Sequence, residues 1–275
     1  MAQLVTRFAP SPNGYLHLGH AFSALTGFHA ARAAGGRFLL RIEDIDTGRA
    51  RPEFEQAIYD DLAWLGIEWD QPVRRQSDHF DDYRRAIDAL TERGLTYPCF
   101  CTRKDVMAAG AQMGPDGPVY PDTCKHLSEQ ERQDRAGRGD AFALRLDVEK
   151  AVQISGPLTW QEQDEGQVQA DPMALGDVVL ARKDIPTSYH VAVVVDDALQ
   201  GVNLVTRGRD LYFATPVHRL LQVLWDLPAP AYHHHRLIAD DTGTRLAKSK
   251  GSPTLKALRE AGESAGDILG VLGLE

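Results

Sequence analysis

The sequence predicts an α/β fold built on a parallel sheet, with a second module inserted into it. Short apolar runs alternate with longer helical stretches over residues 1–98. All three cysteines and a Gly/Pro-rich loop lie within residues 99–177, and strand-like runs return near the end of that segment. Alternating strands and helices are typical of a parallel sheet. We therefore expect a sheet domain from residues 1–98 and 178–250, an inserted module at 99–177 and a short helical tail at 251–275.

Local signals predict the elements of the sheet domain. Residues 4–9 are partly β-branched and end in a Pro/Asn/Gly turn, which indicates the first strand. Residues 18–34 have a helical pattern that stops at two glycines, and the apolar run 38–42 predicts a buried strand. Helices are also expected over residues 52–65, where proline suits the first turn, and over residues 79–93.

The rest of the chain contains shorter elements. Strand-like runs lie at residues 142–146, 177–181 and 191–195. A helix is predicted from about residue 211 to residue 225, and the tail over residues 254–274 predicts two short helices.

Composition excludes several classes of protein. The chain has 275 residues, 43% of them hydrophobic and 25% charged, as in an ordinary globular protein. No run approaches the ~18 apolar residues of a membrane span, and the N-terminus lacks a signal-peptide pattern. Three cysteines do not form a disulfide framework, so we expect a cytoplasmic protein. The net charge of −9 argues against non-specific nucleic-acid coating but allows a local basic site.

The segment from Arg7 to His20, RFAPSPNGYLHLGH, carries the strongest chemical signal. Two imidazoles, His17 and His20, stand where a tight loop leads into a helix, whose unpaired N–H groups and dipole favour phosphate. The histidines can donate hydrogen bonds to a phosphate, and Gly19 lets a nucleotide approach the backbone. Two histidines near a turn would alone indicate a structural role.

A second segment far downstream supports the first. Residues 245–249, RLAKS, form a basic pentapeptide that by itself would indicate a solvated surface loop. A mobile loop that presents Lys248 is also suited to stabilise a departing pyrophosphate.

Two other patterns have simpler interpretations. The sequence from Gly262 to Gly266 matches the nucleophile motif G-x-S-x-G, but no histidine follows it, and it indicates a helix break. Three histidines at 233–235 are expected in a loop, solvated in the main, with one of them reaching the active site.

These two segments, in order with residues 41–46, 194–197 and 205–208, resemble the signatures of class I aminoacyl-tRNA synthetases of the glutamyl and glutaminyl subgroup. The resemblance spans roughly residues 5 to 250. It implies a Rossmann-like parallel-sheet catalytic domain that activates an amino acid with ATP and Mg²⁺.

The resemblance also implies site residues. Substrate glutamate would be held by a set of polar side chains, namely Arg7, Ser11, Glu43, Tyr189 and Arg207. Catalysis and ATP binding would depend on His17, His20 and Lys248, with Gly19 at the nucleotide. Guanidinium groups pair with carboxylates in a bidentate manner, and a glutamate side chain can bind the substrate ammonium.

The acidic segment Glu43, Asp44 and Asp46 also has a structural interpretation, as a solvated turn or as an ion pair with Arg41 or Arg49. The sequence departs from the family at three places. Arg245 and Ala247 replace the usual residues of the second signature, and Val193 stands where full-length members usually carry asparagine.

The cysteines resemble a zinc site of one branch of this family. Cys99, Cys101 and Cys124 supply three thiolates, which match the tetrahedral soft ligation that zinc prefers, and Tyr120 would be the fourth ligand. Asp122 or His126 are alternatives for that position. Three unrelated buried thiols are the structural alternative to a zinc site.

The acceptor is implied by length. Few residues follow the second signature, so we expect no anticodon-binding domain. This resembles the short branch of the family that attaches glutamate to the queuosine base of tRNA(Asp), and we expect a monomer with no membrane association. The alternatives are a minimal synthetase that charges a tRNA 3′ end and a non-catalytic RNA-binding relative.

We predict that Lys248→Ala lowers kcat of ATP–pyrophosphate exchange by about 100-fold, with a smaller change in the KM for glutamate. The reason is that negative charge builds on the departing pyrophosphate in the transition state, where a cation lowers the barrier. Steady-state exchange kinetics measure both constants. A variant altered only in KM would assign Lys248 to ground-state binding.

Overall fold

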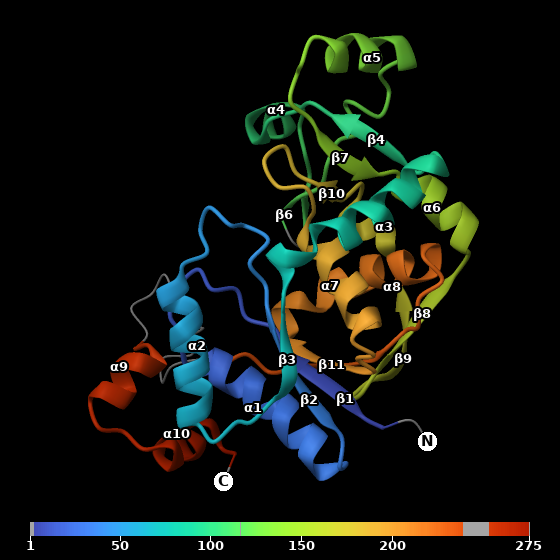
Figure 1. The fold of residues 1–275 in the computed structure, drawn as a ribbon. Coiled ribbons are helices and arrows are strands. Elements are labelled where there is room, and N and C mark those ends of the chain that lie inside the picture. The colour runs from blue at the N-terminus through green and yellow to red at the C-terminus, as the bar shows by residue number, and fades with distance from the viewer. Residues whose placement is uncertain (1–2, 116, 239–252, 275) are drawn as a thin grey trace. The chain divides into compact units, whose positions relative to one another are not determined.

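The computed structural model describes residues 3–115, 117–238 and 253–274, and the chain divides into two compact units (Figure 1). The first unit comprises Met1–Asp78, Gly201–Tyr212 and Pro230–Glu275. The second comprises His79–Gln200 and Phe213–Ala229. The expected boundaries at residues 98 and 178 therefore differ from this division, and the assignment of 99–177 as an inserted module stays a prediction.

The first unit is built on parallel strands. They are β1 (Val5–Phe8), β2 (Arg37–Ile42), β3 (Asp70–Arg75), β11 (Leu204–Gly208) and β12 (Ala231–His235). β2 pairs with β1 and β3, and β11 pairs with β12, all in parallel register. β11 lies beside β1, because the Asn203 side chain accepts the Val5 N–H at 2.8 Å and the Asn203 N–H donates to the Val5 carbonyl at 3.1 Å. The strand order 3-2-1-11-12 is Rossmann-like, as expected.

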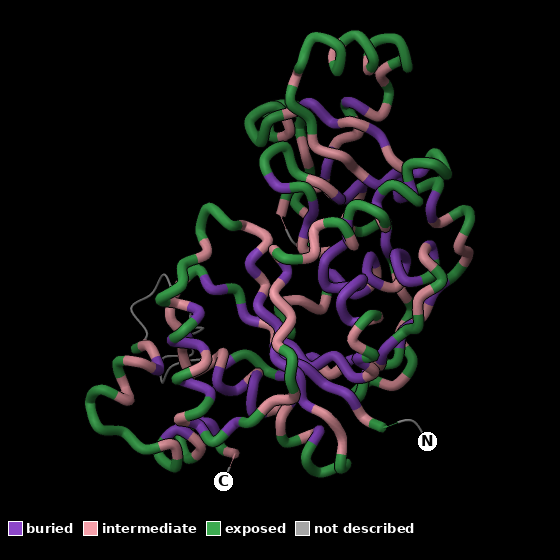
Figure 2. The backbone as a smooth tube through the Cα atoms, viewed as in Figure 1, coloured by how far each residue is buried: buried purple, intermediate pink, exposed green. Residues whose placement is uncertain are grey.

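Among the described residues, the α-helices that accompany this sheet are α1 (Leu18–Ala33), α2 (Pro52–Trp64), α9 (Leu255–Glu260) and α10 (Ala265–Leu272). They share one core with β1 and β2, which includes Leu25, Leu40 and Leu255. α1 packs closely on the strands at Gly27, where a Cβ atom would lie 2.8 Å from the Thr206 hydroxyl. Figure 2 shows the buried residues that line these strands. The predicted strands 4–9 and 38–42 and the predicted helices of this unit are confirmed; β3 has no apolar run to reveal it.

The second unit is mixed. Its α-helices are α3 (Phe80–Glu92), α4 (Arg103–Ala108), α5 (Glu129–Gly137), α6 (Val148–Ser155), α7 (Tyr189–Leu199) and α8 (Thr215–Leu224). An antiparallel sheet has the order β10 (Val179–Ala181), β7 (Ala143–Leu146), β4 (Thr96–Cys99). Two hairpins pair β8 (Leu158–Glu162) with β9 (Gly166–Ala170), and β5 (Met113–Gly114) with β6 (Gly117–Pro118). A short 3₁₀ helix of this unit is η2 (Pro172–Leu175), and two others, η1 (Gln76–His79) and η3 (Arg209–Ala214), lie where the chain passes between the units.

The predicted strand at residues 191–195 is wrong, because these residues lie inside helix α7. All five side chains are buried, and a run that is apolar on every side lacks the periodicity that separates a buried strand from a buried helix. Tyr83 of α3 fixes the helix by donating its hydroxyl proton to Asp196 at 2.9 Å. The helix predicted from residue 211 begins later, since η3 precedes α8.

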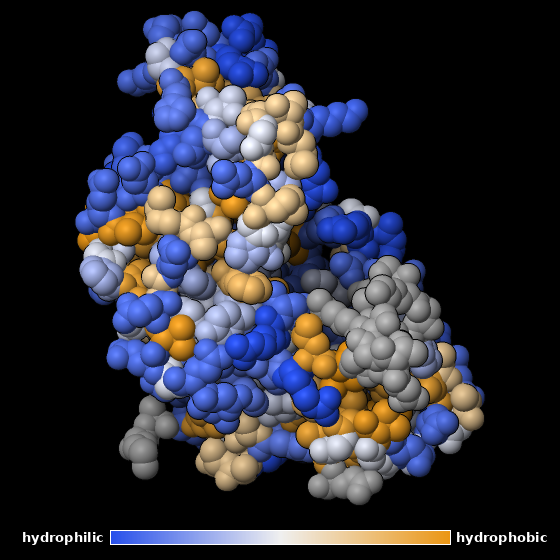
Figure 3. Space-filling view, turned by 180° about the vertical axis from the view of Figure 1, so that it is seen from behind, coloured by the Kyte–Doolittle hydropathy of each residue, from blue (hydrophilic) through white to orange (hydrophobic). Residues whose placement is uncertain are grey.

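The tail forms two short helices as predicted. Gly262 has a φ of +91° between α9 and α10, and Ser264 caps α10 by accepting the Asp267 N–H. The serine of the G-x-S-x-G pattern is thus a helix cap, which confirms the interpretation as a helix break. None of the helices in the described part of the chain is long and apolar enough to span a membrane. Figure 3 shows mostly hydrophilic residues on the face seen from behind, with hydrophobic ones in separate patches.

Candidate active site and thiol cluster

The N-terminus of α1 is closed by the two histidines of the first signature. His17 is the N-cap residue, and its Nδ1 accepts the Gly19 N–H at 3.1 Å. His20 reaches back, and its Nδ1 accepts the His17 N–H at 3.1 Å. The two imidazole rings lie 3.8 Å apart between centroids. This is a capping box formed by histidines in place of the more usual Ser/Thr and Glu.

The capping geometry determines which ring nitrogens carry protons. A neutral imidazole has one N–H and one acceptor nitrogen. Because Nδ1 accepts a backbone N–H in both His17 and His20, the proton of each neutral ring sits on Nε2, which is then a donor. Two Nε2–H donors and a helix N-terminus form a site suited to a phosphate group.

Gly19 lets His17 take this position. A Cβ atom on Gly19 would lie 3.0 Å from Cε1 and 3.1 Å from Nδ1 of His17. Any side chain at position 19 would therefore press on the imidazole that caps the helix. The absence of a side chain at Gly19 therefore leaves room for His17. The expected role of Gly19 at the nucleotide stays a prediction.

Two arginines lie on adjacent strands of the first unit. Arg7 on β1 is 5% exposed and Arg207 on β11 is 4% exposed. The Arg7 Nη1 donates to the Thr206 carbonyl at 3.1 Å, which brings the Arg7 side chain to the backbone next to Arg207. Two buried cations in adjacent positions favour an anionic partner, and a carboxylate matches the geometry of a guanidinium.

Glu43 follows β2 at the end of the sheet where β1 also finishes, and its N–H donates to the Pro10 carbonyl at 3.0 Å. Its carboxylate lies 3.1 Å from Nη2 of Arg41, which is fully buried. Asp46 pairs with Arg49 at 2.7 Å. The ion pairs that the structural interpretation of this segment anticipated are therefore present, and a role of Glu43 in substrate binding stays a prediction.

The other expected glutamate contacts fall in different places. Ser11 is exposed in the turn after β1. Tyr189 belongs to the second unit, where it begins α7 and contacts the buried His218 ring, 5.5 Å between centroids. Val193, which stands in place of the family's asparagine, is buried in the core of that unit.

Lys248, with the rest of residues 239–252, lies outside the described residues. Both flanks of that segment belong to the core of the first unit, through Ile238 and Leu255. The Leu255 N–H donates to the Leu16 carbonyl at 2.8 Å, and Thr254 bridges to His17. The chain that follows the second signature is thus joined directly to the capped start of α1.

The three cysteines meet in the second unit. Their sulfur atoms all lie within 4.8 Å of one another, and those of Cys101 and Cys124 are 3.5 Å apart. The Tyr120 hydroxyl lies 3.6 Å from the Cys101 sulfur and accepts the Cys124 N–H at 2.7 Å. Cys99, Tyr120 and Cys124 are buried in a small core of their own. The structure thereby brings together the four residues that the family resemblance implied.

This cluster fits a zinc ion. Zinc about 2.3 Å from each sulfur in tetrahedral geometry separates the sulfurs by about 3.8 Å, close to the arrangement observed. Among the described residues, neither Asp122 nor His126 joins the group of three thiols, which leaves Tyr120 as the polar group that touches it. Zinc there would supply a structural cross-link.

The thiols differ in their acidity. Burial raises the pKa of the Cys101 thiol to about 11. Burial also opposes ionisation of Cys124, but hydrogen bonds from the Tyr120 hydroxyl and the Phe100 N–H outweigh it and lower the pKa of Cys124. Cys124 is therefore the thiol of the pair that more readily supplies a thiolate.

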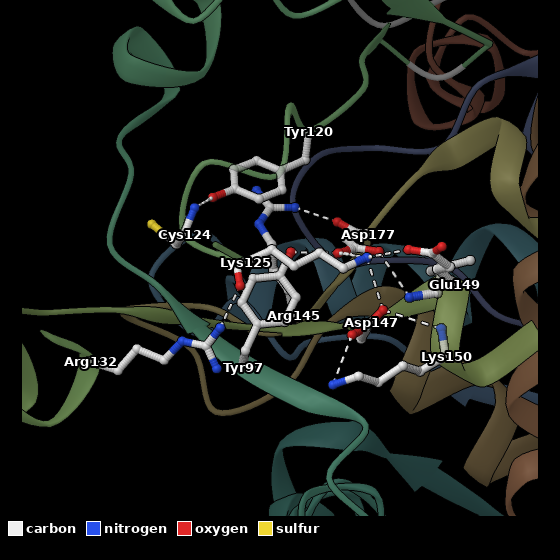
Figure 4. A network of polar contacts seen from close by, with 11 residues as sticks. Tyr97, Tyr120, Cys124, Lys125, Arg132, Arg145, Asp147, Glu149, Lys150 and Asp177 are labelled. Atoms are coloured by element: carbon white, nitrogen blue, oxygen red, sulfur yellow. Dashed lines mark hydrogen bonds and ion pairs between the residues drawn. The ribbon is translucent and has the colours of Figure 1, made fainter. Parts of the chain in front are cut away.

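A buried polar network holds the loop that carries Tyr120 and Cys124 (Figure 4). The Lys125 ammonium lies 2.9 Å from Asp147 and 3.3 Å from Asp177. Asp177 also accepts the hydroxyl proton of Tyr97 on β4 at 2.6 Å. The partners of Lys125 and Asp177 compensate for these buried charges and tie the loop to β4 and α6.

The predicted loop at residues 233–235 is wrong, and with it the prediction that these histidines are mainly solvated. They form the end of strand β12, and His234 and His235 are buried. The sequence does not predict this strand, because three consecutive histidines lack the alternation of apolar and polar residues on which strand prediction depends. His234 pairs in register with Arg207 and accepts its Nε–H at 3.0 Å, a contact that no sequence motif indicated.

Comparison with known proteins agrees with these features. The family model described as tRNA synthetases class I (E and Q), catalytic domain, matches residues 3–273. Proteins named glutamyl-Q tRNA(Asp) synthetase match closely: that of Rhodobacter capsulatus is 50% identical over 98% of this chain and all of its own length. That of Nocardia farcinica is 44% identical over 97% of this chain and 82% of its own.

Glutamate–tRNA ligases are similar over part of their length. The ligase of Aquifex aeolicus is 37% identical over 95% of this chain and 55% of its own length. A crystal structure of the glutamate tRNA ligase of Elizabethkingia meningosepticum in complex with its amino acid superposes with a TM-score of 0.77 at 27% identity. The superposition covers 92% of this chain and 54% of the Elizabethkingia chain. The chain therefore belongs to the class I aminoacyl-tRNA synthetases of the glutamyl and glutaminyl group, a family of ligases.

Proposed function

We propose that this chain activates glutamate with ATP and transfers the glutamyl group to the queuosine base at the anticodon wobble position of tRNA(Asp). In the first step a carboxylate oxygen of glutamate attacks the α-phosphorus of ATP, which forms glutamyl-adenylate and releases pyrophosphate. In the second step a queuosine hydroxyl loses its proton and attacks the glutamyl carbonyl carbon, and AMP leaves.

The observation that carries the proposal is the pair of buried guanidinium groups, Arg7 and Arg207, on adjacent strands. A glutamate side-chain carboxylate placed there forms charge-assisted hydrogen bonds that a neutral amide cannot match. Glu43, at the same end of the sheet, is suited to bind the substrate ammonium. Tyr189 and Ser11 are included among the proposed glutamate contacts only because they match positions of the family motifs.

The start of α1 is suited to ATP. α1 runs back along β1, since Gly27 lies against Thr206 and the Thr6 hydroxyl donates to the Gly27 carbonyl at 2.8 Å. The start of the helix therefore points toward the carboxyl end of β1, the usual ligand side of such a sheet. There the Nε2–H groups of His17 and His20 would donate to phosphate oxygens and stabilise charge that develops in transfer. Mg²⁺ that accompanies ATP would neutralise phosphate charge.

Two points support the acceptor. Relatives matched over most of both chains carry the name glutamyl-Q tRNA(Asp) synthetase, and the one from Rhodobacter capsulatus is matched over its whole length. A single-stranded RNA loop is also a suitable acceptor, because its unstacked bases are splayed out and read by stacking and edge contacts. We also propose that the thiol cluster binds zinc and that residues 99–177 form an acceptor-facing module.

We predict that glutamate is preferred over glutamine by about 10⁴-fold in kcat/KM for ATP–pyrophosphate exchange. The reason is that buried guanidinium groups left facing an amide lose their charged partner. The double variant Arg7→Ala,Arg207→Ala should lose exchange activity, whereas Arg85→Ala, with a largely exposed side chain, should not. Equal rates with the two amino acids would contradict this assignment.

For the cluster, elemental analysis of the purified protein is expected to find about one zinc per chain. Cys99→Ala should lose the metal and lower the Tm, because the thiolate is both ligand and core residue. His126→Ala, at the exposed alternative ligand, should keep the metal. Zinc-free protein whose Tm is unchanged by Cys99→Ala would leave three buried thiols without a metal role.

For the acceptor, labelled glutamate should appear on tRNA(Asp) that contains queuosine and not on tRNA(Asp) that lacks it. The cyclopentenediol of queuosine supplies the attacking hydroxyl, so its removal removes the nucleophile. Transfer assays on the two forms of tRNA(Asp), with tRNA(Glu) as the control, measure this directly. Efficient labelling of tRNA(Glu) would instead support a minimal synthetase that charges a 3′ end.

A further inference from the structure

His234 has the contacts of a residue that sets the orientation of another. It lies on β12 directly opposite Arg207 on β11 and is 2% exposed. The Arg207 Nε donates to its Nε2 at 3.0 Å. Paired positions on neighbouring parallel strands project to the same face of the sheet, so this contact follows from the strand register itself.

The His234 ring is held by two tyrosines. It stacks on Tyr232, with ring centroids 5.7 Å apart and planes 3° from parallel. Tyr212 meets it edge-on at 5.0 Å. The Arg207 guanidinium carbon also lies 5.2 Å from the centre of the Tyr232 ring. A ring packed in this way has little freedom to turn, and it presents Nε2 to the arginine in one direction.

The hydrogen bond has a consequence for both partners. Because Arg207 can only donate, the His234 Nε2 must carry a lone pair, and the neutral ring then bears its proton on Nδ1. A guanidinium is planar, so holding its Nε holds the plane in which its other N–H groups point. A carboxylate that binds in a bidentate manner requires that plane to be correctly placed.

We propose that His234 is a positioning residue, which orients Arg207 for the substrate carboxylate through a neutral Nδ1–H imidazole. The inference rests on the proposed recognition of glutamate by Arg207 and assigns to His234 no contact with the substrate. It also gives a role to His234, a buried histidine that takes no part in the proposed reaction itself.

The kinetic test compares two substitutions at one position. His234→Leu, which cannot accept a hydrogen bond, should raise the KM for glutamate in ATP–pyrophosphate exchange by about 10- to 100-fold and change kcat less. His234→Gln, whose amide oxygen can accept the Nε–H, should restore the KM to within about threefold of the wild type. His29→Leu, the same change at an exposed position on α1, should behave as wild type.

A double-mutant cycle separates positioning from direct binding. Adding His234→Leu to Arg207→Ala should change kcat/KM by less than about twofold, because His234 acts only through the arginine. A normal KM in His234→Leu, or a further large loss in the Arg207→Ala background, would overturn the inference. The inference would also be overturned if His234→Gln folded normally but did not restore the KM for glutamate.

A spectroscopic readout keeps the inference separate from the reaction. Long-range ¹⁵N–¹H correlation spectra of the wild-type imidazoles at neutral pH should show His234 as the Nδ1–H tautomer. An Nε2–H tautomer or an imidazolium would refute the positioning role even if glutamate were activated normally. Conversely, a wild-type protein without glutamate-dependent exchange would refute the proposed function, and the tautomer would still decide the hydrogen bond.

Discussion

The burial of two guanidinium groups side by side is the constraint on which the first unit depends. Arg7 and Arg207 come from distant parts of the chain, and only the pairing of β1 with β11 brings them together. Buried cations destabilise a fold unless carbonyl, imidazole or anionic partners compensate for the lost water. The Thr206 carbonyl and His234 supply part of that compensation and orient the groups at the same time.

The same strand arrangement explains why the features proposed to bind phosphate lie nearby. α1 follows β1 and runs back along it, packed at Gly27, so its start lies toward the carboxyl end of the sheet. His17 and His20 satisfy backbone N–H groups through Nδ1 and thereby keep Nε2–H as a donor. One pair of side chains thus stabilises the helix terminus and, in the proposed reaction, would donate hydrogen bonds to the reacting phosphate.

The thiol cluster lies in a region whose stability is limited by the small size of its core. Its surroundings have a small core of five buried residues, and three of these, Cys99, Tyr120 and Cys124, belong to the cluster itself. A core of this size gains little from hydrophobic burial, and polar links carry more of the stability. The Lys125 network with Asp147 and Asp177 ties the loop to the rest of the second unit, and a zinc ion held by the three thiols would add a cross-link at the same place.

The sequence by itself determined the α/β class, the place where α1 starts, the helix break at Gly262 and the spacing of the cysteines. Each depends on residues close together in the chain or on a motif that a family shares. Tertiary structure decided the rest. Residues 191–195 are apolar on every side, so their sequence pattern does not separate a buried strand from the buried helix that they form. His234 lies in a strand because β12 pairs with β11, and no local apolar pattern indicates this. Local patterns record which faces are apolar, but the pairing of Arg207 with His234 depends on contacts between strands far apart in the sequence.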